Sequence, residues 1–215
     1  MLWSQVKYRH PPFIQVAMPS FEEIQYYFSA VWRTMTGHPE ALNDLNTDAD
    51  GFWRSFYALL IALPPMLIGW VEIAARLTDG NDDAALRIMS TAKLGLIDTT
   101  VWLLPLLIIG FLSRSLGLER RFSTYVVATN WTTALFAWVY APLSFLNLLL
   151  PDLSTVFAGI GFGLFLITLG LSYRLTRAAL QRPHSFAAPF FISVVLGSIM
   201  LTIILQSLAG FMPAA

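Results

Sequence analysis

Cysteine is absent from the 215 residues of the chain, which excludes disulfide bonds, thiolate metal sites, iron–sulfur clusters and cysteine nucleophiles. Histidine is scarce: His10, His38 and His184 lie far apart, and none has the spacing of a metal site. The hydrolase G-x-S-x-G, metalloprotease H-E-x-x-H and Walker motifs are missing too. We therefore expect no metal, no cofactor and no enzymatic activity.

Charged residues are also scarce. Only 12% of the residues are Asp, Glu, Lys or Arg, against about a quarter in an average soluble domain, and 56% are hydrophobic. The formal net charge is +0, so nucleic acid is not an expected partner. A chain this apolar is predicted to be an all-α, polytopic integral membrane protein.

Five apolar runs reach the roughly 20 residues that a helix needs to cross a bilayer. The predicted spans are residues 52–75, 94–113, 122–150, 153–173 and 186–212. They form a transmembrane domain, 52–215, after an N-terminal segment, 1–51. The last three spans contain no charged residue, whereas the second contains Asp98. We expect Asp98 to lie at a helix start or membrane interface, with an intramembrane proton or ion site as the alternative.

Basic residues fall unequally on the two sides of these spans. Of the 13 Lys and Arg residues, ten lie on the side of the N-terminus, and the other side has Arg76, Arg87 and Lys93. Cytoplasmic loops carry the positive excess, so the N-terminus is predicted inside and the C-terminus outside a bacterial inner membrane. Anionic lipid headgroups, a protein partner or a second copy of the chain are expected at Arg114, Arg120, Arg121, Arg174, Arg177 and Arg182.

Residues 20–36 are predicted to form an amphipathic helix on the inner membrane surface. Ser20 and Glu23 have the spacing of a capping box, and Gly37 follows as a stop. Apolar residues then recur at helical spacing, beginning with Phe21, Ile24 and Phe28. This stripe is predicted to contact lipid or a partner, and the alternative is that it packs on the protein's own loops.

The rest of the N-terminal segment offers no stronger signal. Residues 1–17 lack the apolar core of about 7 to 15 residues that a signal peptide needs, and Met1 and Met18 are alternative translation starts. The alternation of Asn46, Asp48 and Asp50 is typical of the first half of a calcium loop, but Tyr57 stands where the closing Glu would be. We interpret this linker as a solvated turn in which Asp50 caps the first span.

Small residues at four-residue spacing occur in the last two spans. Such a spacing lets membrane helices approach closely. We therefore expect the fourth and fifth spans to pack through Gly159, Gly163, Ser193 and Gly197.

Prolines recur at one depth of the first three spans. Pro64, Pro105 and Pro142 lie nine or ten residues from a charged residue, which is ~15 Å at 1.5 Å per helical residue and half the ~30 Å hydrocarbon thickness. We expect the helices to break there and to free backbone carbonyl groups. Asn130 carries amide donors at the same depth, so the sequence predicts a midplane polar patch of Asn130, Pro64, Pro65, Pro105 and Pro142.

The number of spans and two stretches of the second half resemble the Ypt-interacting-protein (Yip) family of small membrane proteins. The stretches are LERRFSTYVVATNWTTALFAWVYAPLSF, residues 118–145, and SYRLTRAALQRPHSFAAPFFISVVLGSIMLTII, residues 172–204. The resemblance implies five spans and an adaptor role in membrane traffic. The tryptophan-rich, proline-bearing spans are also similar to small bacterial inner-membrane proteins. We predict a non-enzymatic membrane adaptor or assembly factor, and the alternative is a small-solute transporter or channel component built on the midplane patch.

Overall fold

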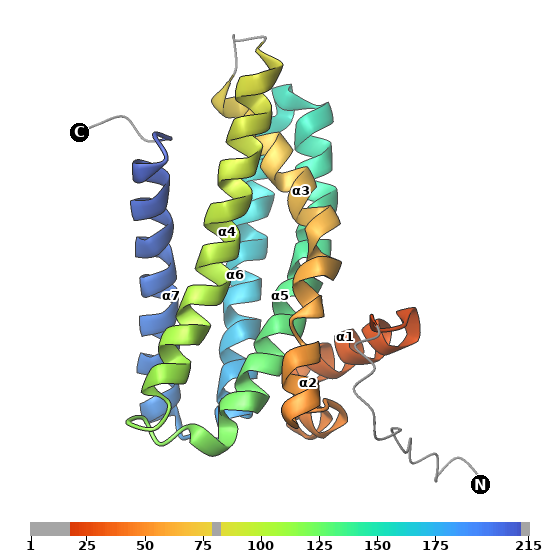
Figure 1. Cartoon of the computed structure of the whole chain (residues 1–215). Coiled ribbons are helices and arrows are strands. Elements are labelled where there is room, and N and C mark those ends of the chain that lie inside the picture. Colours follow the sequence, from red (N-terminus) through yellow and green to blue (C-terminus); the bar gives the residue numbers. More distant parts are fainter. Residues whose placement is uncertain (1–17, 79–82, 212–215) are drawn as a thin grey trace, which may run out of the picture.

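The computed structural model describes residues 18–78 and 83–211. Within these ranges every regular element is helical (Figure 1), and five helices are long and apolar enough to cross a membrane. The elements are α1 (Phe21–Thr36), η1 (Pro39–Asp44), α2 (Ala49–Arg54), α3 (Tyr57–Leu77), α4 (Ala84–Leu112), α5 (Glu119–Leu149), η2 (Pro151–Leu153), α6 (Ser154–Leu180) and α7 (His184–Leu208).

Two of the long helices extend beyond the apolar runs of the sequence. α4 begins at Ala84, ten residues before the predicted span 94–113, and the Asp83 side chain caps it by accepting from the Ala85 amide at 2.9 Å. Asp98 therefore lies inside α4 rather than at a helix start. α6 likewise continues to Leu180, past residue 173. An apolar run marks the part of a helix suited to lipid, whereas polar residues can continue the same helix in water.

Proline does not interrupt the long helices. The expected breaks near the midplane are wrong, because α3 runs through Pro64 and Pro65, α4 through Pro105 and α5 through Pro142. Each proline removes one backbone hydrogen bond, but the neighbouring bonds keep the helix continuous. The chain instead changes direction between α2 and α3, where the Ser55 and Phe56 amides bond to carbonyls three residues back.

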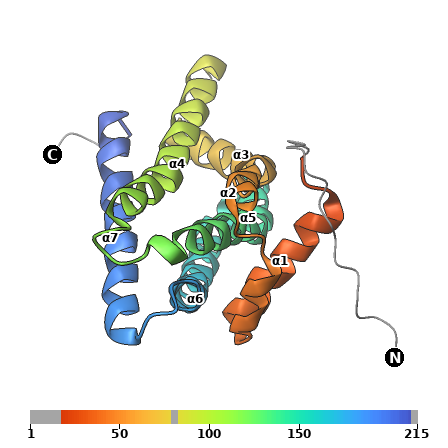
Figure 2. The same ribbon diagram turned by 60° about the horizontal axis from the view of Figure 1, so that its bottom comes forward.

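α5 lies at the centre of the bundle. α3 and α6 pack along it, α4 packs on α3, and α7 contacts α4 and α6 at one edge (Figure 1 and Figure 2). The 3-10 turn η2 joins α5 to α6 in a short antiparallel hairpin. α1 contacts α5 and α6 and lies against the lower part of the bundle in Figure 1, at a steep angle to the long helices.

The buried core is concentrated at one end of the bundle. This end carries α1, α2, the α4–α5 turn (113–118) and the α6–α7 turn (181–183), and we call it the basic end because of the arginines described below. Its largest fully buried side chains include Trp131, Met35, Leu118 and Leu180. The opposite end has a smaller cluster of Trp70, Ala74 and Leu94. Most apolar side chains along α7 are exposed or half-buried, so the bundle is well packed mainly where α1 covers it.

Candidate functional site

The linker before α2 is a tight turn closed by Asp48. The Asp48 Oδ1 accepts from the Gly51 amide at 2.8 Å, so Asp48 caps α2, and the prediction that Asp50 does so is wrong. Asp48 directly precedes the helix, which is the position from which a side chain reaches a free first-turn amide. Asp50 lies within that first turn and is exposed. In the described part of the chain, no three His, Asp or Glu side chains gather as a metal ion requires.

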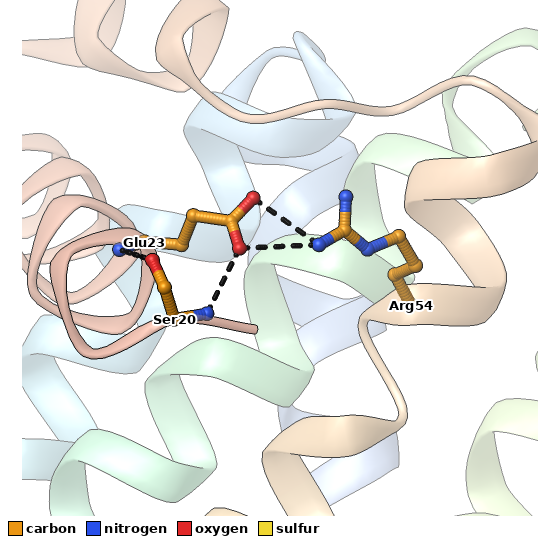
Figure 3. A network of polar contacts seen from close by, with 3 residues as sticks. All are labelled: Ser20, Glu23 and Arg54. Atoms are coloured by element: carbon orange, nitrogen blue, oxygen red, sulfur yellow. Dashed lines mark hydrogen bonds and ion pairs between the residues drawn. The ribbon is translucent and has the colours of Figure 1, made fainter. Parts of the chain in front are cut away.

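The beginning of α1 is tied to α2 through Glu23. The predicted capping box is present: the Ser20 Oγ accepts from the Glu23 amide at 3.2 Å, and the Glu23 carboxylate accepts from the Ser20 amide at 3.0 Å. The same carboxylate accepts from the Arg54 guanidinium at 3.1 and 3.2 Å (Figure 3). Partly exposed ion pairs contribute only about 0 to 1 kcal/mol. This ion pair therefore sets where the start of α1 lies relative to α2, but it contributes little to the free energy that keeps α1 on the bundle.

Apolar packing holds α1 on the bundle. Val31 and Met35 are fully buried, and the ring of Tyr27 lies 4.7 Å from that of Trp131. Ile24 and Phe28 pack against the same core, so for these two residues the structure shows the self-packing alternative. Burial also raises the pKa of the Tyr27 phenol above its ordinary value.

The outer side of α1 carries exposed aromatic side chains. Phe21 is 72% exposed, Tyr26 is 53% exposed and Trp32 is 48% exposed. Phe21 and Trp32 are eleven residues apart, which places them about 20° apart around a helix of 3.6 residues per turn. Both therefore lie on one edge of the helix, beside the stripe that packs on the bundle.

Arginine side chains gather at the basic end. Three of them connect parts of the chain: Arg121 donates to the Gln181 side chain, Arg182 donates to the Gly117 carbonyl at 2.7 Å, and Arg114 lies 3.7 Å from Glu119. No acidic side chain among the described residues forms an ion pair with the other three, which are exposed: Arg120, Arg174 and Arg177. The six arginines predicted to lie on the inner side thus share one end of the molecule.

Asn130 is completely buried, and both polar atoms of its side chain have a hydrogen-bond partner in the bundle. Its Nδ2 donates to the Ser55 Oγ at 2.9 Å, and its Oδ1 accepts from the Trp102 Nε1 at 3.0 Å. Ser55 in turn donates to the Phe52 carbonyl at 2.7 Å. This chain of hydrogen bonds joins α4, α5 and the bend between α2 and α3. Asn130 is therefore a structural link at the bend, rather than the donor to proline-freed carbonyls that the sequence suggested.

The prolines lie in different surroundings. The Ile61 carbonyl, which Pro65 leaves without its helical donor, accepts from the Trp138 Nε1 at 3.1 Å. Pro65 is buried, whereas Pro64 and Pro142 are exposed. Pro105 lines a groove between α4 and α7 that neither Asn130 nor the other three predicted patch prolines line. The structure does not bring the five residues of the predicted midplane patch together.

Two acidic side chains within the long helices, Glu72 and Asp98, have partners near the opposite end. Glu72 is buried on α3, where it accepts from the Asn147 Nδ2 at 2.9 Å and pairs with Arg76 at 2.8 Å. Asp98 accepts from the Trp70 Nε1 at 2.7 Å. The available signal was an acidic residue in an apolar run, since such residues need a partner. The sequence alone could not show that this partner is Asn147 for Glu72, because the two residues lie 75 positions apart in the chain.

The glycines predicted to pack α6 on α7 face open space. A Cβ added at Gly159, Gly163 or Gly197 would meet no atom within 4 Å, and Ser193 lines the α4–α7 groove. Close approach occurs instead at two glycines of α4. A Cβ at Gly95 would lie 3.0 Å from Trp70, and one at Gly110 would lie 2.9 Å from Phe122. Aromatic side chains of neighbouring helices occupy the space that these glycines leave.

No protein-family model, curated protein or solved structure matches the chain. The contacts at the basic end are therefore the basis of the functional conclusion. They combine a docked helix with exposed aromatic side chains and a group of exposed arginines.

Proposed function

We propose that the protein crosses a bacterial inner membrane five times, with the basic end in the cytoplasm. Five helices of sufficient length and apolarity support this, as do exposed side chains such as Phe111, Phe162 and Leu208. Of the described Lys and Arg residues, Arg76, Arg87 and Lys93 lie at the opposite end, and the remaining eight lie at or near the basic end. Cytoplasmic segments of membrane proteins carry this excess.

Reporter fusions test the orientation. A reporter that is active only outside the cytoplasm should be active when fused after Ala215 and silent when fused after Arg182, because one helix, α7, separates the two positions. A cytoplasm-dependent reporter at the same two positions should give the opposite result and controls for expression. Activity after Arg182 together with silence after Ala215 would reverse the proposed orientation.

Within this membrane the protein acts as a non-enzymatic adaptor or assembly factor of the Yip-like kind. The observation that carries the proposal is the surface of the basic end. Exposed aromatic side chains of α1 lie there on the same end of the bundle as Arg120, Arg174 and Arg177, which form no ion pair with an acidic side chain among the described residues. Because α1 lies at a steep angle to the long helices, it would run along the membrane surface. Phe21 and Trp32 would then contact lipid headgroups or a partner protein. The arginines would contact the negative charge of the headgroups or of that partner.

Replacing the exposed edge of α1 tests the adaptor role. In the variant Phe21→Ser with Trp32→Ser, the affinity for a co-purifying partner should fall about thirtyfold, since an exposed Trp at an interface is worth around 2 kcal/mol. Ile24 and Phe28 remain, so the melting temperature should stay unchanged. The matched control is Phe162→Ser, which removes an exposed aromatic ring from α6 and should leave recovery unchanged. Equal recovery with the α1 variant would contradict the proposal.

Glu72 favours a second candidate function, a small-solute transporter or channel component. Its carboxylate is buried beside Asn147, whose Oδ1 is also buried and has no hydrogen-bond partner among the described residues. Ionisable groups within spanning helices commonly mark solute or ion pathways. Solute uptake into vesicles that contain only the purified protein would support this function. Absence of uptake, together with recovery of a partner, would support the adaptor.

A further inference from the structure

An apolar groove runs between α4 and α7 and ends at the basic end. Its volume is about 660 Å³, and Ser185, Ser193 and Ser198 are the polar residues among those that line it. This size lies within the range of ~300 to 1,000 Å³ that is typical of small-molecule sites. Along α7 the lining runs from Ser185 to Ile204, which is ~28 Å at 1.5 Å per residue. The groove is therefore narrow, long and almost entirely apolar, as a lipid chain requires.

Positive charge lies at the inner mouth of this groove. The Arg182 guanidinium lies 5.6 Å from the ring centre of Phe186, which lines the groove. It also donates to the Gly117 carbonyl, next to the lining residue Leu116. Arg114 and Arg120 belong to the same turn and the start of α5, and both are exposed. In the described ranges no carboxylate forms an ion pair with Arg182 or Arg120.

We propose that the groove binds one anionic phospholipid, with an acyl chain between α4 and α7 and the phosphate at Arg182. This inference rests on the proposed membrane location and orientation. Basic pockets between spanning helices on the cytoplasmic side are suited to anionic headgroups. A phosphate would supply the negative charge that no described carboxylate gives to Arg182, whereas the apolar helix of a second copy would cover only the apolar length of the groove. A long apolar groove with an arginine at its mouth therefore favours a lipid over a second copy of the chain.

Lipids that differ only in the headgroup test the charged mouth. The full chain, purified in mild detergent, is offered phosphatidylglycerol or phosphatidylcholine with identical acyl chains, and bound lipid is counted by native mass spectrometry. Phosphatidylglycerol should bind at least fivefold more tightly, and Arg182→Gln should reduce that preference about fivefold, as expected for ~1 kcal/mol per arginine at an anionic surface. The matched control is Arg177→Gln, which removes an exposed positive charge away from the groove and should keep the preference.

Filling the groove tests the apolar part. Gly197 lines the groove, and a Cβ there would meet no atom within 4 Å, so Gly197→Leu should fold normally and place its side chain in the space of the acyl chain. We expect phosphatidylglycerol binding to fall about tenfold while the melting temperature of the lipid-free protein is unchanged. Equal binding of the two lipids by the unaltered chain would overturn the proposal, as would full phosphatidylglycerol binding by Gly197→Leu. A Gly197→Leu variant that changes its oligomeric state but keeps its bound lipid would overturn it too. With the reporter result and partner recovery intact, such a failure removes only the lipid site.

Discussion

Gly51→Ala is expected to unfold the region that holds α1 and α2 together. A Cβ at this buried position would lie 2.1 Å from the Asn46 carbonyl oxygen and 2.5 Å from its carbonyl carbon. These atoms belong to the backbone, so rotation of a side chain cannot relieve the clash. The linker would have to move, and the bond from the Gly51 amide to Asp48 would be lost with it. Overpacking of about 1 to 3 kcal/mol together with about 1 kcal/mol for the cap gives a loss of roughly 3 kcal/mol.

A second glycine provides the matched control for this substitution. Gly163 lies inside α6, and a Cβ there would meet no atom within 4 Å. Gly163→Ala should therefore leave the stability unchanged or raise it by up to about 1 kcal/mol, because alanine favours helix more than glycine does. Thermal unfolding in detergent measures both variants. Similar melting temperatures for the two would show that the linker does not need glycine at position 51.

The protein should also become sensitive to protease near the linker when Gly51 is replaced. α1 packs on the core through Val31 and Met35, and the linker sets where that helix lies. Displacement of the linker would expose these side chains and the backbone around residues 38–48. Faster cleavage in that segment for Gly51→Ala, with unchanged cleavage for Gly163→Ala, would locate the damage at the basic end. Cleavage at unchanged rates would contradict this account.

Local patterns predicted the helices and several of their ends. The capping box of Ser20 and Glu23 depends on residues three apart, and the Gly37 stop depends on the last turn of the same helix. Such signals act within one turn, so a single sequence contains them. The cap of α2 shows the limit, because Asp48 and Asp50 both suit a helix start and the sequence analysis selected the wrong one.

Partners from distant parts of the chain could not be predicted in the same way. The proline rule predicts freed backbone carbonyls, but it could not show that the Ile61 carbonyl accepts from Trp138, 77 residues away. Asn130 was predicted as a member of the midplane patch, whereas its partners are Trp102 and Ser55. Its partner Ser55 lies 75 residues away, at a bend that no proline marks. Residue counts predict how far along its helix each residue lies, but they do not predict the direction of its side chain around the helix.

The small-residue spacing on α6 and α7 illustrates the same difficulty. Gly159 and Gly163 lie four residues apart and so share one side of α6, but the structure turns that side away from neighbouring helices. The glycines in close contact, Gly95 and Gly110, stand alone in α4 and face Trp70 and Phe122. A spacing motif identifies a side of a helix that could be approached closely. Which helix approaches it depends on the packing of the whole bundle.

Asn130→Leu should lower stability by about 2 kcal/mol and weaken the joint between α4, α5 and the bend at Ser55. Asn130 is 0% exposed, and the change leaves the Trp102 Nε1 without an acceptor in a dry environment. Hydrogen bonds between membrane helices average about 0.6 kcal/mol and reach about 1.7 kcal/mol. Two such bonds are lost here, to Trp102 and Ser55, and the buried leucine does not have the shape of the amide that it replaces. A melting temperature several degrees lower in detergent is the expected measurement.

A double-mutant cycle shows whether these hydrogen bonds form one connected network. Trp102→Phe removes the indole donor, so Asn130→Leu should cost less in that background than alone, with a coupling of about 0.5 to 1.5 kcal/mol. Trp70→Phe is the matched control, because it removes an indole whose acceptor is Asp98 and which shares no partner with Asn130. Its effect should add to that of Asn130→Leu. Additivity in the Trp102 cycle would mean that Asn130 stabilises the bend through Ser55 alone, and that α4 is held by apolar packing without this link.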